Sequence, residues 1–129
     1  MVQLALEFWP AELLVGVGQR MVVTNNESLA HNVHVRFADT DSTVFDIDTL
    51  SGQSLEFVFE REGGYDVTCN VHPEMHAFIY ATATPYAAFA DDEGYFLLPD
   101  IPPGTYTLSV WSVAPELRSE ETIDVGGSE

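Results

Sequence analysis

Residues 64–75 read Gly-Tyr-Asp-Val-Thr-Cys-Asn-Val-His-Pro-Glu-Met. The first part of this stretch has the small, aromatic and β-branched residues of a strand, and the strand ends on a thiol, Cys69. A tight loop follows, and it carries the imidazole of His72 and the thioether of Met75. Three side chains that bind metal ions therefore lie within seven residues, so they can surround one ion without bringing distant backbone together.

Short apolar runs that alternate with polar residues recur on both sides of this stretch, whereas helical periodicity is almost absent. Turn signals containing Gly, Pro and Asn separate these runs. The pattern is typical of an all-β sandwich. It predicts strands at residues 3–8, 13–17, 20–25, 31–37, 54–60, 64–69 and 77–83, and solvated acidic loops at residues 39–48 and 91–93.

The character of the chain changes after Pro85, where two turn sequences, at residues 91–94 and 100–104, precede an alternating run at 105–111. A segment of about forty residues with three or four short strands is marginal by itself. We therefore expect a main domain at residues 1–83 and a β-extension at residues 84–125 that packs on it. A flexible tail is expected at the C-terminus, at residues 126–129.

The charge of the chain is strongly negative. It has 21 acidic residues against four arginines and no lysine, and its net charge is −17. Such a field repels nucleic acid and anionic membranes, and it favours cationic partners. Adaptation to a saline habitat is an equally good explanation of the acidity, and the two can coexist.

The sequence gives two observations about location. No stretch of 18 or more apolar residues occurs, so we expect no membrane span. Residues 1–10 lack the basic-then-apolar pattern of a signal peptide. This leaves a cytoplasmic protein or one whose leader has been removed, and of these we expect a periplasmic or extracellular location.

The combination of donors in the loop favours one kind of metal site. Thiolate, imidazole and a weak axial thioether together form the donor set of blue-copper electron-transfer centres. A fourth donor must then come from another part of the fold. His31 is the best candidate, because it begins a strong strand after a polar loop.

Each donor also has an interpretation that involves no metal. A lone Cys in a strand is usually a small buried hydrophobe, and Met often fills a core, but the spacing favours ligand roles for Cys69 and Met75. His31 could be a turn histidine. Strand alternation points His34 to the opposite face from His31, and we expect neither His34 nor His76 to be a ligand.

These residues carry a resemblance to the cupredoxins of the amicyanin and plastocyanin type. The Cys-x-x-His-x-x-Met loop, with a proline after the histidine, is similar to that of amicyanins. The run His-Asn-Val-His at residues 31–34 matches the upstream ligand motif of the same family. The resemblance covers residues 1–83, and it implies a Greek-key β-sandwich that binds one copper ion.

The resemblance also implies a role for each residue. His31 and His72 would bind copper through imidazole nitrogens, Cys69 through its thiolate, and Met75 at a longer axial distance. Asn32 would hydrogen-bond the loop of residues 69–75, called the ligand loop below, and hold it closed.

As a function, the resemblance implies a one-electron carrier rather than an enzyme. The edge of His72 beside Pro73 is the expected exit for the electron, and Glu74 would favour a positively charged redox partner such as a basic cytochrome c, or a dehydrogenase. Four histidines are too few for the additional centres of a multicopper oxidase. The alternatives are a copper carrier or buffer protein and, on the basis of the extension alone, a structural β-domain.

The extension carries a second resemblance. Residues 85–86, 92–96 and 101–111 look like the carboxypeptidase regulatory-like β-repeat. Cupredoxins with such an extension resemble proteins that are called methylamine-utilisation proteins.

Overall fold

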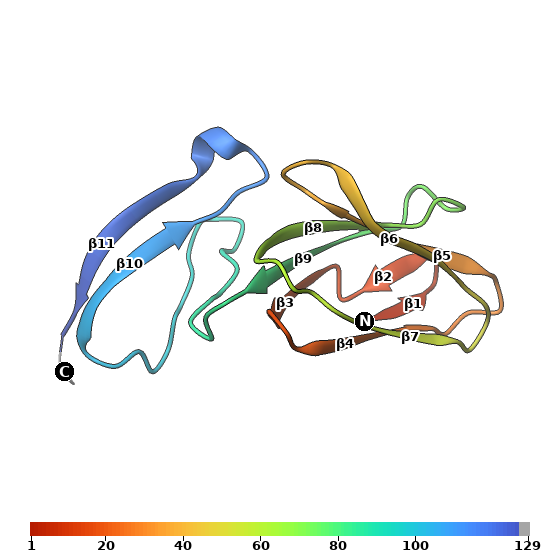
Figure 1. The fold of residues 1–129 in the computed structure, drawn as a ribbon, viewed down its shortest axis with the longest axis horizontal. Coiled ribbons are helices and arrows are strands. Elements are labelled where there is room, and N and C mark those ends of the chain that lie inside the picture. Colours follow the sequence, from red (N-terminus) through yellow and green to blue (C-terminus); the bar gives the residue numbers. More distant parts are fainter. Residues whose placement is uncertain (127–129) are drawn as a thin grey trace. The chain divides into compact units, whose positions relative to one another are not determined.

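The computed structural model describes residues 1–126 and divides the chain into two compact units, Met1–Pro85 and a second that begins at Tyr86. Within the described residues all regular structure is β except for one turn of 3-10 helix, Pro115–Leu117 (Figure 1). No helix in this part of the chain is long and apolar enough to cross a membrane. Residues 127–129, which form most of the predicted tail, lie outside the described residues.

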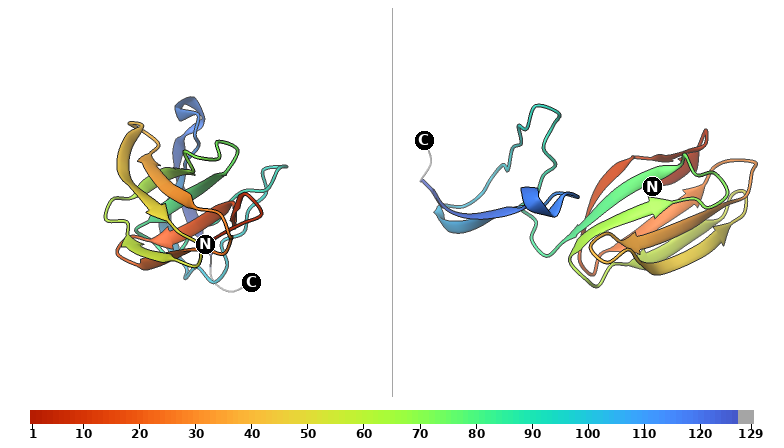
Figure 2. Two further views of the ribbon diagram at one scale, coloured as in Figure 1. Left: turned by 90° about the vertical axis from the view of Figure 1, so that its right-hand side faces the viewer. Right: turned by 90° about the horizontal axis from the view of Figure 1, so that it is seen from above.

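The first unit is a sandwich of two sheets (Figure 1, Figure 2). One sheet has the order β2-β1-β4-β7 and the other the order β3-β9-β8-β5-β6. Neighbouring strands are antiparallel, except that β1 is parallel to β4 and β3 is parallel to β9. The predicted all-β sandwich is confirmed, with strands β1 (Val2–Leu4), β2 (Glu7–Trp9), β3 (Glu12–Gly16), β4 (Arg20–Asn25), β5 (His31–Phe37), β6 (Ser42–Thr49), β7 (Ser54–Val58), β8 (Gly63–Thr68) and β9 (His76–Thr82).

The core of this unit follows from the alternation of its strands. On β5 the side chains of Val33, Val35 and Phe37 are buried, and those between them are only partly covered. β8 begins close to the ring of Phe37: a Cβ at Gly63 would lie 2.8 Å from that ring, and Gly63 has φ +144°. Glycine is needed there because a side chain would both clash and strain the backbone.

Two predictions for the first unit are wrong. The expected strand at residues 3–8 is a hairpin, because Ala5 and Leu6 adopt positive φ values of 54° and 58° and reverse the chain between β1 and β2. The expected acidic loop at residues 39–48 contains most of β6, the edge strand beside β5. Phe45 and Ile47 alternate with Asp46 and Asp48, but most of the side chains of β6 are exposed, and its acidic residues indicate a solvated loop.

The second unit contains a hairpin of β10 (Gly104–Val110) and β11 (Ser119–Val125). β10 corresponds to the expected strand at 105–111, and the turn at residues 91–94 is present, with Gly94 N–H donating to the Asp91 carbonyl at 3.0 Å. The expected three or four strands are wrong, because residues 86–126 contain two. No residue among 86–126 is fully buried. β11 is rich in acidic residues, so its sequence lacks the apolar residues that would predict a strand.

Candidate metal centre

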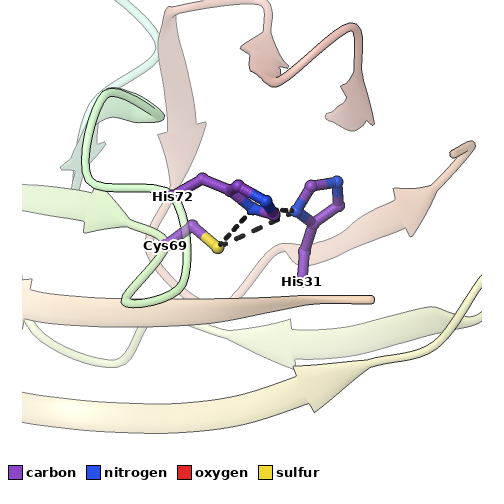
Figure 3. Close-up of side chains that lie close together, drawn as sticks. All are labelled: His31, Cys69 and His72. Atoms are coloured by element: carbon purple, nitrogen blue, oxygen red, sulfur yellow. Dashed lines mark hydrogen bonds between the residues drawn. The ribbon is translucent and has the colours of Figure 1, made fainter. Parts of the chain in front are cut away.

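Strand pairing brings together two parts of the chain that are far apart in sequence. β5 and β8 are antiparallel neighbours, with His34 opposite Thr68. The first residue of β5, His31, therefore lies at the same end of the sheet as Cys69, which directly follows the last residue of β8. The loop of residues 69–75 then returns to β9 and carries His72 over the same place (Figure 3).

The side chains of His31, Cys69 and His72 point toward one another (Figure 3). The two Nδ1 atoms are 3.0 Å apart, and each lies 3.9 Å from Sγ of Cys69. A triangle with these sides has a point about 2.1 Å from all three corners, close to the bonds of about 2.0–2.3 Å that zinc forms with imidazole nitrogen and thiolate sulfur. The donors therefore fit a single first-row metal ion.

A carboxylate fixes the orientation of the His31 ring. Nε2 of His31 lies 2.9 Å from Oε1 of Glu27, and the His31 side chain is fully buried. The same oxygen accepts the N–H of Leu6 at 2.9 Å, and this bond, with that from His31, holds the pKa of Glu27 below its ordinary value. The ionised carboxylate places the imidazole proton on Nε2, which leaves the lone pair of Nδ1 facing Cys69.

Glu27 was not predicted from the sequence. It lies in the polar loop before β5, where a single glutamate has no pattern that distinguishes it from a solvated acid among 21 acidic residues. Its contact with Leu6 depends on the unpredicted hairpin between β1 and β2, so only the folded chain shows it.

Met75 closes the ligand loop. Its side chain has no exposed surface, and its backbone N–H donates to the carbonyl of His72 at 2.9 Å. Burial keeps the thioether away from water, as both a core residue and an axial ligand require. Within the same loop His72 is half-buried, while Pro73 and Glu74 are exposed.

Asn32 joins the two segments that carry the cluster. Its backbone N–H donates to Sγ of Cys69 at 3.5 Å, and its side-chain Oδ1 accepts the backbone N–H of Asn70 at 2.6 Å. The first bond places a donor against the sulfur, and the second ties the start of the ligand loop to β5.

The remaining histidines lie outside this cluster. His34 has partners other than the cluster: its Nδ1 lies 3.0 Å from Oδ1 of Asn70 and its Nε2 lies 2.8 Å from Oγ1 of Thr43. His76 is more than half exposed, with Nε2 3.5 Å from a carboxylate oxygen of Asp66. The structure thus groups His31 with Cys69 and His72 and places His34 and His76 elsewhere.

Comparisons with known proteins agree with the sandwich fold and with a copper site. The copper-binding proteins of the plastocyanin/azurin family match residues 2–82. Among solved structures, a reduced mutant of amicyanin is 24% identical, with a TM-score of 0.57, and a mutant of amicyanin in its Cu(I) form is 23% identical, with a TM-score of 0.57. Each alignment covers 63% of this chain and 78% of the other, and at this identity it shows the fold alone. A comparison with curated proteins gives no match. The chain therefore belongs to the plastocyanin/azurin family of copper-binding proteins, and its cofactor is one copper ion.

Proposed function

We propose that this protein is a blue, type 1 copper protein that carries one electron at a time between redox partners. His31, Cys69 and His72 are the close ligands, and Met75 is the axial ligand. The observation that carries the proposal is the triangle of two imidazole nitrogens and one thiol, with sides of 3.0, 3.9 and 3.9 Å. Copper in such a donor set supplies a one-electron couple between Cu(I) and Cu(II).

The residues around the triangle hold it in place. Glu27 orients His31, Asn32 N–H points at the sulfur of Cys69, and the Met75 N–H bond closes the loop on His72. Ligands fixed by such contacts keep nearly the same geometry around Cu(I) and Cu(II), so little rearrangement accompanies electron transfer. Burial of His31 and Cys69 excludes water from the donors.

The surface beside His72 is suited to contact with a partner. The ring is half-buried, and its neighbours Val71 and Pro73 are exposed, which gives an apolar approach to one ligand. Exposed Glu74 and the net charge of −17 favour a positively charged redox protein, such as a basic cytochrome c or a dehydrogenase. Family membership favours a periplasmic or extracellular location for this exchange.

For the second unit we infer a regulatory-like β-extension. The turn at residues 100–104 leads directly into β10, and β10 pairs with β11 along its whole length. These features support a β-hairpin module, to which we assign no part of the copper chemistry.

Titration of the metal-free protein with Cu(II) tests the copper proposal. An intense thiolate-to-copper visible band with a reversible redox wave supports the electron carrier. A colourless protein that binds only Cu(I) would indicate a copper carrier or buffer, and no binding would refute both.

A second experiment concerns the acidic surface. Reduction of cytochrome c that weakens with added salt supports docking through this surface, whereas a folded state that loses stability without salt supports adaptation to a saline habitat.

Glu27→Gln is expected to lower the affinity for Cu(II) by about ten- to a hundredfold, the usual loss when a carboxylate that orients a ligating imidazole is removed. A neutral amide polarises the Nε2–H of His31 less, and it can turn its own NH₂ toward the ring. Competition titration with a Cu(II) chelator measures the change. Glu74→Gln, which removes an equal charge from the exposed ligand loop, is the control and should stay within about twofold of the wild type. Equal affinities for both variants would show that Glu27 does not orient His31.

A further inference from the structure

A hydrogen-bond network away from the cluster connects the two chain segments that carry the proposed ligands. At its centre is Asp46, on the edge strand β6. Oδ1 of Asp46 accepts the side-chain amide of Asn32 at 2.6 Å, and Oδ2 accepts the side-chain amide of Asn70 at 3.0 Å. Asn32 directly follows His31, and Asn70 directly follows Cys69, so one carboxylate holds both segments.

The network determines which way each amide points. Oδ1 of Asn32 accepts the backbone N–H of Asn70 at 2.6 Å, so the NH₂ group of Asn32 must be the end that donates to Asp46. With this side chain held at both ends, the backbone N–H of Asn32 is fixed toward Sγ of Cys69, at 3.5 Å. Asn32 is 3% exposed, so water has little access to its end of these bonds.

His34 and Thr43 support the other amide. Because Asn70 donates its NH₂ group to Asp46, its Oδ1 is the acceptor for Nδ1–H of His34, at 3.0 Å. Nε2 of His34 lies 2.8 Å from the hydroxyl of Thr43 on β6. His34 is opposite Asp46 in the strand register, so the network spans β5, β6 and the ligand loop.

We propose that Asp46 is a positioning residue for the copper thiolate. Asp46 holds Asn32 and Asn70 so that the N–H of Asn32 stays on the sulfur, and this hydrogen bond raises the reduction potential of the site. The proposal rests on the copper ligation proposed above. A hydrogen bond to the sulfur withdraws electron density that the thiolate would otherwise give to copper, and hydrogen bonding around this sulfur tunes the potential of blue-copper sites. A weaker bond would favour Cu(II).

Asp46→Asn is the test, and Asp48→Asn is the matched control. Asp48 lies on the same strand, is also exposed, and carries the same charge, so its loss reproduces the Coulombic effect without breaking the bonds of Asp46. Loss of a negative charge alone favours Cu(I) in both variants. An asparagine at 46 keeps one acceptor but presents its NH₂ to a second NH₂, so it cannot hold both amides.

Two readouts are expected to separate the variants. Voltammetry measures the reduction potential, which gives the ratio of Cu(II) affinity to Cu(I) affinity. This ratio is about three- to tenfold higher in Asp46→Asn than in Asp48→Asn, and a tenfold higher ratio lowers the potential of a one-electron couple by about 59 mV. In the metal-free protein, hydrogen exchange measured by NMR is about tenfold or more faster at the backbone N–H groups of Asn32 and Asn70 in Asp46→Asn only. The difference between the two potentials persists at high salt, because salt screens the Coulombic effect of both charges equally and leaves the positions set by direct hydrogen bonds in place.

A second variant protects the test against a change in folding. Asn70→Ala removes one of the two amides without touching β6, and it should lower the potential in the same direction. Because both residues act through one network, the double variant should show little more change than Asp46→Asn alone. Additive shifts would overturn the proposal.

Other outcomes are also decisive. Equal potentials for Asp46→Asn and Asp48→Asn, with unchanged exchange at Asn32 and Asn70, would show that Asp46 acts only as a surface charge. If the wild type has no thiolate-to-copper band, the copper proposal itself fails. A normal wild-type band with indistinguishable variants refutes only the role of Asp46.

Discussion

Cys69→Ser is expected to abolish the intense visible band and the reversible redox wave of the copper-loaded protein. The band requires a thiolate bound to copper, and a serine hydroxyl is neither deprotonated at neutral pH nor a soft donor. Sγ of Cys69 lies 3.9 Å from both Nδ1 atoms, so this substitution removes one corner of the donor triangle. Copper affinity should fall by more than about ten- to a hundredfold, which is the usual loss when a residue that hydrogen-bonds a metal ligand is removed.

The metal-free Cys69→Ser variant should remain folded, which keeps the result interpretable. Serine is close to cysteine in shape, and the N–H of Asn32 is already placed to donate to the atom at this position. Burial of the hydroxyl costs about 1–3 kcal/mol, and this bond offsets part of that cost. Far-UV circular dichroism and denaturant unfolding check the fold. If an intense band survives in the folded variant, the ligand assignment is wrong.

The approach of Cys69 and His72 was predictable because the two residues are local in sequence. They lie within four residues, so their approach needs one tight loop and no long-range information. The bounds of β5 were also predicted correctly, because its inward side chains alternate strictly from Val33 to Phe37. His31 required more, since its approach to Cys69 depends on β5 pairing with β8, which periodicity alone does not specify.

The supporting carboxylates could not be predicted, for a physical reason. Glu27 and Asp46 act through contacts that depend on the β1–β2 hairpin and on the edge strand β6. Neither element is easy to recognise: the hairpin turn has positive φ at two residues that are not glycine, and β6 is mostly exposed and alternates Phe45 and Ile47 with two aspartates that indicate a loop. In a chain with 21 acidic residues, a carboxylate with a structural role resembles one that only faces solvent.

Met75→Leu is expected to keep the visible band and to raise the reduction potential. Leucine has nearly the volume of methionine, so the exchange costs less than about 1.5 kcal/mol even at a site with no exposed surface. Leucine has no lone pair to donate, so copper would be left with three ligands. Cu(II) gains more from a fourth, axial ligand than Cu(I), for which three ligands suffice. Loss of the donor therefore favours Cu(I), and each tenfold change in the affinity ratio raises the potential by about 59 mV.

Met21→Leu provides the control for this experiment, because it makes the same exchange at a buried position on β4, in the other sheet. Voltammetry should show a higher potential for Met75→Leu and an unchanged one for Met21→Leu. The two interpretations of Met75, axial ligand and core residue, make opposite predictions here, since a residue that only fills the core changes stability and leaves the potential alone. Equal potentials for both variants would assign Met75 to the core and leave copper with His31, Cys69 and His72 as its ligands.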